Sequence, residues 1–327
     1  VLIDQYLENA TEVDVDALCD ESGQVVIGGL MEHIEPAGIH SGDSACCLPS
    51  VSLKPEALAT IRQWSADLAR SLQVQGLINL QFAVCQDEVY IIEANPRASR
   101  TVPFVAKATG VPLAKLASRL MAGRSLEQLG LQEEPKPPLQ AIKEAVLPFR
   151  RFPGSDTVLG PEMRSTGEVM GTASNFGMAY AKAELAAGEV LPTKGTVFLS
   201  THDRDKEALV EVAGKLQEQG FELIATEGTA KYLCSNGLKV KPVLKVHEGR
   251  PNIEDAIRYD QVQMIINTPI GRQAAHDDRY LRRAALDYRV PTVTTLAGAR
   301  AAVEAVGCLQ RQNDLPINAL QDLHQQS

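Results

Sequence analysis

Short apolar runs alternate with stretches of amphipathic helix in residues 191–327, and this alternation limits the fold more than any other feature. The runs are TVFLS, ELIAT, VKPVLKV, QMIINT and TVTT, and each has the length and β-branched content of a strand. Between the first two, the segment KEALVEVAGKLQEQG forms one apolar helical face from Leu209, Val212, Ala213 and Leu216. Strands that alternate with helices predict a parallel, doubly wound α/β domain.

Residues 1–190 mix strands and helices without that regular alternation, and we expect a separate α+β domain there. Near its start, acidic and apolar residues alternate, which predicts a strand with one buried and one solvated face. The acidic residues are Glu12, Asp14 and Asp16, of which the last two are expected in solvent. A helix is predicted over residues 57–73, with a buried stripe made of Leu58, Ile61, Trp64, Leu68 and Leu72.

The composition argues against several classes of protein. The net charge is −9 over 327 residues and aromatic residues make up 5%, which argues against a nucleic-acid surface. No apolar run approaches the ~18 residues of a membrane span. The six cysteines include no CxxC pair, which is typical of reduced thiols in a cytoplasmic protein. The chain opens directly on the strand-like VLIDQYL, so we expect a piece of a longer polypeptide.

Two apolar segments, GLINLQFAV and EVYIIEA, are separated by three polar residues and predict a β-hairpin. With the turn centred on Asp87, Gln81 lies opposite Glu93 and Asn79 lies opposite Asn95. The four side chains share one face of the sheet because side chains alternate along a strand. Oxygens of Gln81, Glu93 and Asn95 then converge, and such oxygens are the ligands that suit Mg²⁺ beside a phosphate.

A proline ends the second strand of this hairpin, and two arginines follow it. The guanidinium groups of Arg97 and Arg100 suit the recognition of phosphate or carboxylate. The alternative is a surface ion-pair network with Glu93, which would contribute little to stability.

A second polar cluster, EPAGIHSGDS, begins at Glu35. Its glycines, Gly38 and Gly42, allow a ligand to approach the backbone closely, and His40 and Ser41 offer hydrogen-bond donors. An ordinary polar turn is the alternative interpretation.

In the second domain, polar residues lie where the expected parallel strands end. Ligands of open α/β sheets gather at this edge, and a Thr-Glu-Gly-Thr turn that opens a helix offers backbone N–H groups to a phosphate. Threonines that only cap helices are the alternative. The candidates at this edge are Ser200, Lys206, Thr226, Thr229, Lys245 and Asn267.

Several of these segments together resemble a known family. VLIDQYLENATEVDVDA, EHIEPAGIHSGDSA, NLQFAV and IIEANPRASRTVPFVAKATG are similar to successive pieces of an ATP-grasp fold. The IHSGDS and LGPEMRSTGEVMG segments make the chain most similar to the synthetic, carboxy-terminal half of the carbamoyl phosphate synthase large subunit. The domain from residue 191 onward resembles the methylglyoxal synthase-like allosteric domain of the same subunit.

The resemblance implies an ATP-dependent ligase that transfers the γ-phosphate of ATP to carbamate and forms carbamoyl phosphate for pyrimidine and arginine synthesis. It implies Mg²⁺ or Mn²⁺, and also K⁺, as cations, a small glutaminase subunit as partner, and an oligomer of heterodimers. The family's ATP-grasp site has a further subdomain with a phosphate loop, so we expect the isolated chain to be inactive. A nucleotide-binding regulatory module without catalysis is the alternative function.

The resemblance also assigns roles to single residues. Asp4 and Leu7 match the adenine-binding segment, and Glu12 matches the ribose ligand. The nucleotide pocket corresponds to Gly38, Ile39, His40 and Ser41. The cation ligands correspond to Gln81, Glu93 and Asn95, and the groups at the transferred phosphoryl group and the substrate correspond to Arg97 and Arg100, with Asn95 among the catalytic set.

Two sets of regulatory residues follow from the same resemblance. The six candidates at the strand ends of the second domain match the family's site for UMP and IMP, although Pro269 stands where the compared pattern has a threonine. An ornithine site is implied by Glu35, Asp43, Glu144 and Thr294, with Thr292 in place of a tyrosine.

A true methylglyoxal synthase activity is not expected in the second domain. His276 and Asp277 precede a predicted helix, but HEGRPNIED occupies the region of that enzyme's Gly-Gly-Asp segment. Without that catalytic carboxylate, the lyase reaction has no proton acceptor.

Overall fold

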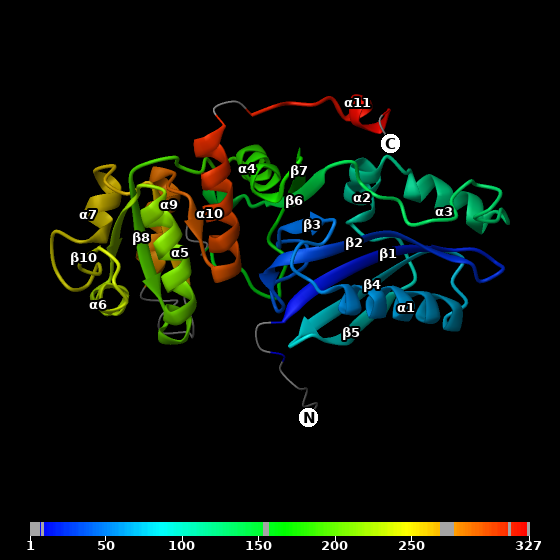
Figure 1. Ribbon diagram of the computed structural model, residues 1–327, viewed down its shortest axis with the longest axis horizontal. Helices are drawn as coiled ribbons and strands as arrows, with labels where there is room; N and C mark the ends of the chain where they lie inside the picture. The colour runs from blue at the N-terminus through cyan, green and yellow to red at the C-terminus, as the bar shows by residue number, and fades with distance from the viewer. Residues whose placement is uncertain (1–6, 8–9, 153–156, 269–277, 313–314, 326–327) are drawn as a thin grey trace.

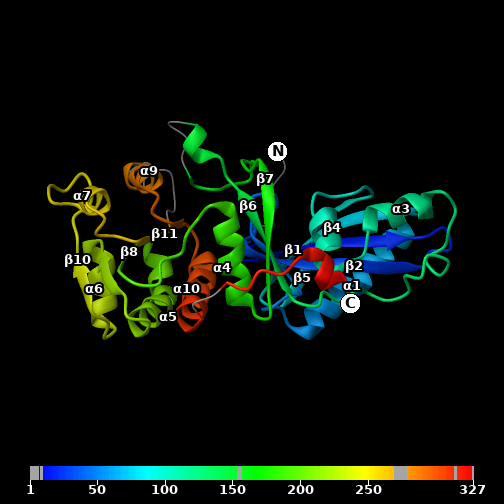
Figure 2. The same cartoon turned by 90° about the horizontal axis from the view of Figure 1, so that it is seen from above.

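The computed structural model describes residues 7, 10–152, 157–268, 278–312 and 315–325. They form two β-sheets, with helices α4 and α10 between them (Figures 1 and 2). The strands are β1 (Thr11–Cys19), β2 (Val25–Pro36), β3 (Cys46–Leu48), β4 (Gly76–Cys85), β5 (Glu88–Asn95), β6 (Gln140–Val146), β7 (Gly167–Ala173), β8 (Thr196–Thr201), β9 (Glu222–Ala225), β10 (Val240–Pro242), β11 (Met264–Thr268) and β12 (Thr292–Val293).

The α-helices alternate with the strands from β8 onward and are distributed irregularly among the strands before it, as the sequence predicts. They are α1 (Pro55–Ser71), α2 (Val102–Thr109), α3 (Leu113–Met121), α4 (Phe176–Ala187), α5 (Lys206–Glu218), α6 (Glu227–Ser235), α7 (Ile253–Arg258), α9 (Arg279–Tyr288), α10 (Leu296–Arg311) and α11 (Leu320–His324). None of the helices among the described residues is long and apolar enough to cross a membrane.

The first sheet has seven strands in the order β5-β4-β1-β2-β3-β6-β7, and every pairing in it is antiparallel. Helix α1 packs on one face over Val15 and Ile78. Helices α2 and α3 cover the opposite face over Leu18 and Met31. The sheet therefore has a hydrophobic core on both sides, and β1 lies near its middle.

The prediction that Asp14 and Asp16 face solvent is wrong. Their exposed fractions are 2% and 0%. The segment leading into α2 covers Asp16, and Asp14 contacts His33 and Asn79. The prediction for the buried stripe of α1 is also wrong in part: Trp64 and Leu72 are exposed. Ile61 of the predicted stripe is buried, and the other buried positions of α1 are the small residues Ala57, Ser65 and Ala69, which let the helix approach the sheet closely.

The β4–β5 hairpin has the predicted pairing at its functional end. Gln81 lies opposite Glu93, and Asn79 lies opposite Asn95. The turn itself differs from the prediction, since it has two residues, Gln86 and Asp87, both with positive φ. A register irregularity after Gln81 absorbs the difference. Strand β5 is the edge strand of its sheet, and none of its residues is buried.

The second sheet has five strands in the order β10-β9-β8-β11-β12, all parallel. Helices α5, α6 and α10 contribute to the core on one face. Helices α7 and α9 cover the other face. This arrangement confirms the predicted doubly wound domain and the predicted α5 face of Leu209, Val212, Ala213 and Leu216, all of which are buried.

The two sheets share one continuous hydrophobic cluster. It runs from Ile142 of β6 through Met178 of α4 and Ala302 of α10 to Val197 of β8. Helix α11, near the end of the chain, returns to helix α2 (Figure 1), where His324 Nε2 lies 2.8 Å from the Lys107 carbonyl oxygen. The division into domains 1–190 and 191–327 stays a prediction, although it separates the strands of the first sheet from those of the second.

Close packing of α4 on β7 generates the first testable prediction. A β-carbon at Gly171 would overlap the Ala179 carbonyl oxygen and lie 2.5 Å from the Ala183 nitrogen. We expect Gly171→Ala to destabilise the protein by about 3 kcal/mol, because backbone must move to make room. Gly167→Ala, on the same strand with open space around it, is the matched control and should leave the midpoint of chemical unfolding nearly unchanged. Equal midpoints for both variants would contradict this packing.

Candidate functional site

Two adjoining pockets lie where the β4–β5 hairpin faces the loop after β2. The larger has a volume of about 370 Å³, and the smaller has a volume of about 140 Å³. Residues common to both linings are His40, Ser41, Gln81 and Glu93. The two pockets therefore form one continuous site.

Most of the site residues predicted for the first domain come together here. The larger pocket is also lined by Glu12, Gly38 and Ile39. The smaller one is also lined by Arg97 and Arg100. Leu7 and Asn95 lie outside both linings, and Asp4 lies outside the described residues.

The predicted cation ligands come from neighbouring strands. Glu93 of β5 lies directly across from Gln81 of β4, and Gln81 Nε2 lies 3.5 Å from Ser41 Oγ. Asn95 Nδ2 donates to Glu93 Oε1 at 2.7 Å, so this amide touches the carboxylate from the side. One carboxylate and one amide oxygen facing a phosphate-sized pocket fit a divalent cation.

The arginines extend the site along the segment that joins β5 to α2. The Arg97 guanidinium donates to the Ala98 carbonyl oxygen at 3.2 Å, and Arg100 contacts the Met163 sulfur. Within the part of the chain that the structure describes, neither side chain forms an ion pair with a carboxylate. Among the described residues, the alternative of an ion-pair network between Glu93 and the arginines therefore finds no support.

The His40 ring has a defined orientation at the junction of the pockets. Its Nδ1 accepts a hydrogen bond from the Gly42 backbone nitrogen at 3.0 Å. The neutral ring therefore carries its proton on Nε2, which makes that atom a donor for an anion in the site.

Beneath the site lies a buried ion pair that sequence reasoning missed. His33 Nε2 lies 2.9 Å from Asp14 Oδ2, and both residues are nearly fully buried. Burial acts to lower the pKa of His33, but Cys46 and Asp14 raise it well above its ordinary value. Burial acts to raise the pKa of Asp14, but hydrogen bonding to His33 leaves it lowered. Each shift favours the charged form of its group.

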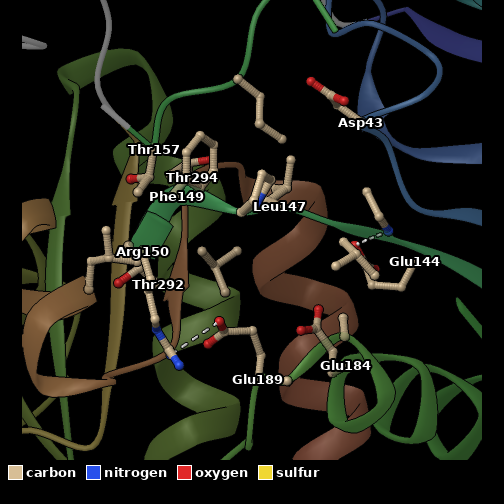
Figure 3. A pocket seen from close by; sticks show the side chains of 18 of the residues that line it. Asp43, Glu144, Leu147, Phe149, Arg150, Thr157, Glu184, Glu189, Thr292 and Thr294 are labelled. Atoms are coloured by element: carbon tan, nitrogen blue, oxygen red, sulfur yellow. Dashed lines mark hydrogen bonds and ion pairs between the residues drawn. The ribbon is translucent and has the colours of Figure 1, made fainter. Parts of the chain in front are cut away.

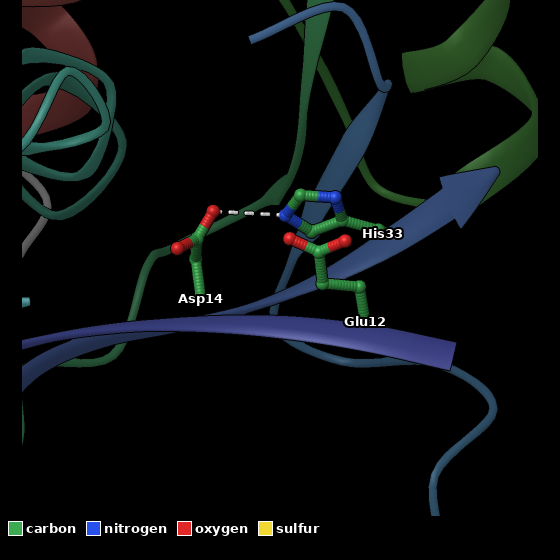
Figure 4. Close-up of side chains that lie close together, drawn as sticks. All are labelled: Glu12, Asp14 and His33. Atoms are coloured by element: carbon green, nitrogen blue, oxygen red, sulfur yellow. Dashed lines mark hydrogen bonds and ion pairs between the residues drawn. The ribbon is translucent and has the colours of Figure 1, made fainter. Parts of the chain in front are cut away.

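Glu12 joins this pair to form a compact group. One ligand atom from each of Glu12, Asp14 and His33 lies within 4.8 Å of the others, a spacing small enough for a metal ion (Figure 4). The His33 nitrogen, however, already binds the Asp14 carboxylate. This group is thus satisfied as an ion pair, with Glu12 facing the larger pocket.

Lys143 of β6 is a second residue that the sequence did not single out. Its exposed fraction is 1%, its Nζ donates to the Ser41 carbonyl oxygen at 3.2 Å, and it lines the smaller pocket. It gives that pocket a third cation beside the two arginines. A lysine within QAIKEAV has no local signal of function, since only tertiary packing brings it to the site.

The predicted effector residues of the second domain are only partly gathered. Ser200, Thr226 and Lys245 line a small pocket of about 10 Å³. Thr226 Oγ1 donates to Thr229 Oγ1 at 3.2 Å. Lys206 pairs with Asp203 at 2.6 Å, and its Nζ is 3.5 Å from the place where a Gly228 β-carbon would lie.

Asn267 differs from the other effector candidates because its amide is used by the fold. It donates to the Ser200 carbonyl oxygen at 3.3 Å and to Asp278 Oδ2 at 2.9 Å. It also accepts from Arg282 Nη1 at 3.2 Å. Pro269, His276 and Asp277, on which further predictions fall, lie outside the described residues.

A third pocket, which we call the seam pocket, lies between the two sheets and has a volume of about 480 Å³ (Figure 3). Its lining includes the four predicted ornithine residues and Thr292. Asp43 is already engaged, since its carboxylate accepts from the backbone nitrogens of Arg164 and Ser165 at 2.7 and 2.8 Å. Glu35 likewise accepts from Ser44 and Ala45.

Two further carboxyl groups that line the seam pocket, those of Glu144 and Glu184, have raised pKa values. Enclosure in the pocket, together with Glu184 and Glu35, raises the pKa of Glu144 well above its ordinary value. Enclosure and the nearby Glu189 and Glu35 raise the pKa of Glu184 to about 7. Glu184, on α4, was not predicted from the sequence. The close acidic groups make the pocket suited to a cationic ligand.

Comparisons with known proteins agree with these features. Residues 1–129 match the family model for the carbamoyl-phosphate synthase L chain, ATP binding domain, and residues 208–294 match that for an MGS-like domain. The carbamoyl phosphate synthase large chain of Synechocystis is 60% identical over 98% of this chain and 30% of its own length. The protein of the same name from Methanosarcina barkeri is 52% identical over 100% of this chain and 82% of its length.

Among solved structures, the biotin carboxylase domain of a single-chain bacterial carboxylase is similar to part of the fold. It covers 56% of this chain and 48% of its own, at 19% identity and a TM-score of 0.45. The chain spans 30% of the length of the first of the curated relatives that it matches.

The seam pocket predicts a pH-dependent stability. A carboxyl whose pKa rises from 4.5 to about 7 on folding binds its proton more tightly in the folded state, so stability falls as pH rises through this window. Glu184→Gln keeps the neutral form, and we expect its melting temperature to exceed that of the wild type by roughly 2 to 4 °C at pH 8. At pH 5 the two should melt together.

The control for this prediction is Glu218→Gln, which changes an exposed carboxylate in the last turn of α5. Thermal unfolding followed by circular dichroism at several pH values measures all three proteins. A Glu184→Gln curve parallel to the wild-type curve from pH 5 to pH 8 would contradict the assignment.

Proposed function

The chain belongs to the family of carbamoyl phosphate synthase large chains, and from this premise we propose that it carries part of the site that phosphorylates carbamate with ATP. The observation that carries the proposal is the convergence of Gln81, Glu93, Arg97 and Arg100 on one pocket system beside His40. Such a set binds phosphates, a divalent cation and an anionic acceptor together, as phosphoryl transfer requires.

In the proposed reaction, a carbamate oxygen attacks the γ-phosphorus of ATP. A new phosphorus–oxygen bond forms, the bond to the β-phosphate oxygen breaks, and ADP leaves. The protein's contribution is mainly positioning and charge neutralisation, since phosphoryl transfer needs little covalent chemistry from side chains. The nucleoside part of ATP occupies the larger pocket, where Glu12 accepts from the ribose and Gly38 and Ile39 flank the base.

The triphosphate extends into the smaller pocket. Arg97 and Arg100 stabilise the negative charge of the transferred group and of carbamate, with bidentate guanidinium contacts. Lys143 adds charge from below, and His40 Nε2 donates to a phosphate oxygen. Groups that already line the pocket before the substrate binds lower the reorganisation needed in the transition state.

Gln81 and Glu93 would hold Mg²⁺ or Mn²⁺, with Asn95 supporting Glu93 through their mutual hydrogen bond. A divalent cation held there would offset the negative charge that builds up on the phosphate oxygens. The proposal also includes K⁺ as an additional cation of the enzyme.

A regulatory role is proposed for the second sheet and the seam. The acidic seam pocket suits the two ammonium groups of ornithine, and the end of β8 together with the start of α6 suits the phosphate of UMP or IMP. In the whole enzyme the proposal includes the small glutaminase subunit, assembly into an oligomer of heterodimers, and a cytoplasmic place in pyrimidine and arginine synthesis. If the chain were a purely regulatory module, the convergence of Glu93 and the arginines on one pocket would have no function.

The metal assignment predicts the effect of one isosteric change. In the whole enzyme, Glu93→Gln should lower carbamoyl phosphate formation at least about 100-fold, because a charged ligand contributes several kcal/mol of charge stabilisation. Glu88→Gln is the matched control, since Glu88 lies on the same strand and bonds to Tyr90 outside the site. Carbamoyl phosphate formation from bicarbonate, ammonia and MgATP is the measurement. Full activity in Glu93→Gln with unchanged folding would exclude the assignment.

The effector assignment predicts a second effect. Lys245→Ala should weaken the binding of UMP or IMP about 10-fold or more, because one charge-assisted contact to a phosphate is lost. Lys241→Ala is the control: this lysine is exposed on the neighbouring β10 and pairs with Glu222. Calorimetric titration of each variant with both nucleotides gives the dissociation constants. Equal affinities of the two variants for both nucleotides would place the effector site elsewhere.

A further inference from the structure

The segment between β5 and α2 carries both arginines of the proposed phosphate site, and its attachment to the fold decides where they point. Its side chains at Pro96, Arg97, Ala98 and Arg100 are exposed. Ser99 and Thr101, the two neighbours of Arg100, turn inward instead. The buried partner of both is Asp16, in the middle of β1.

Asp16 holds these neighbours with one carboxylate oxygen each. Ser99 Oγ donates to Oδ1 at 2.7 Å, and Thr101 Oγ1 donates to Oδ2 at 2.7 Å. The two hydroxyl oxygens are themselves 2.7 Å apart. Asn79 Nδ2 adds a third donor to Oδ1 at 3.1 Å. Hydrogen bonds to a charged acceptor are stronger than those between neutral groups.

Two features set this arrangement apart from ordinary packing. Thr101 is the N-cap residue of α2, yet its side chain makes no cap hydrogen bond; the hydroxyl that would cap the helix, a contact of about 1 kcal/mol, is directed to Asp16. The carboxylate is fully enclosed, and burial raises its pKa to about 6. Thr101 therefore bonds to Asp16 instead of capping α2, and the Asp16 carboxyl is buried. Together with the bond from Ser99, this contact holds the residues on both sides of Arg100.

We propose that Asp16 is a positioning residue that sets the place of Arg100, and through the same segment of Arg97, by clamping Ser99 and Thr101 onto β1. This inference rests on the proposed function of the arginines. A side chain on a clamped backbone reaches the transferred phosphoryl group without a search through other orientations. A displacement of about 1 Å in such a group costs about 100-fold in rate.

The test uses the whole enzyme and the reverse half-reaction, in which carbamoyl phosphate and MgADP form ATP. Asp16→Ala should lower kcat about 100-fold, while KM for MgADP changes less than about threefold, because the arginines act on the transferred group. Asp16→Asn should recover about a tenth or more of the wild-type kcat, since it keeps the shape and one acceptor oxygen. A pure KM effect in Asp16→Ala, with kcat unchanged, would overturn the proposal, and so would a kcat in Asp16→Asn that is no higher than in Asp16→Ala.

Asp20→Ala is the matched control. Asp20 follows β1, is 2% exposed, and accepts from Ser22 Oγ at 2.6 Å and from the Leu126 nitrogen at 3.0 Å, at the end of β1 away from the arginines. It should be destabilised to a similar degree as Asp16→Ala, with kcat within about twofold of the wild type. Should Asp16→Ala fail to fold, the pair Ser99→Ala with Thr101→Val removes the clamp from its other side and should lower kcat as much.

A second measurement does not depend on the reaction. Trypsin should cleave the native protein after Arg97 and Arg100 about 10-fold faster in Asp16→Ala than in Asp20→Ala, because the segment is no longer held. If the wild type forms no ATP, the proposed function fails and the inferred role of Asp16 fails with it, while faster cleavage would still show the clamp as a structural feature. If cleavage accelerates while kcat stays at the control value, or if neither changes, Asp16 is not a positioning residue.

Discussion

The antiparallel pairing of β4 with β5 is the contact on which the rest of the phosphate site depends. It places Glu93 across from Gln81, and a shift of one residue would turn either side chain to the other face of the sheet. The same strand then delivers Pro96 and the arginine segment to the start of α2. The register irregularity after Gln81 lets a tight two-residue turn coexist with this pairing.

The buried polar groups below the hairpin support the site from β1. Asp14 pairs with His33, and Asp16 binds the segment before α2. They occupy successive inward positions on one strand, because residues two apart share a face.

The seam pocket is built differently, from residues of both sheets. Glu144 of the first sheet and Thr294 beyond the second line it together, so a ligand bound there contacts both parts of the protein.

Much of this architecture could be predicted from the sequence, because it rests on periodicity and turn chemistry. The parallel sheet and the cross-strand pair of Gln81 with Glu93 are of this kind. The burial of Asp16 could not be predicted, since an acidic alternation looks the same whether water or another segment covers it. Lys143 and Glu184 were missed for a similar reason: only the tertiary packing of their elements brings them to a pocket. The stripe of α1 was misjudged in part, because the small residues Ala57, Ser65 and Ala69 face the sheet beside Ile61.

The position of β5 at the end of its sheet has a consequence for handling the protein. An edge strand presents unpaired backbone groups to solvent, and here Ile91 and Ile92 are also 42% and 57% exposed. Such an edge is a template for strand addition by another chain. The charges of Glu88 and Glu93 on the same strand oppose that association by repelling a second copy. Concentrated solutions should therefore tolerate low salt better than high salt, where this repulsion is screened.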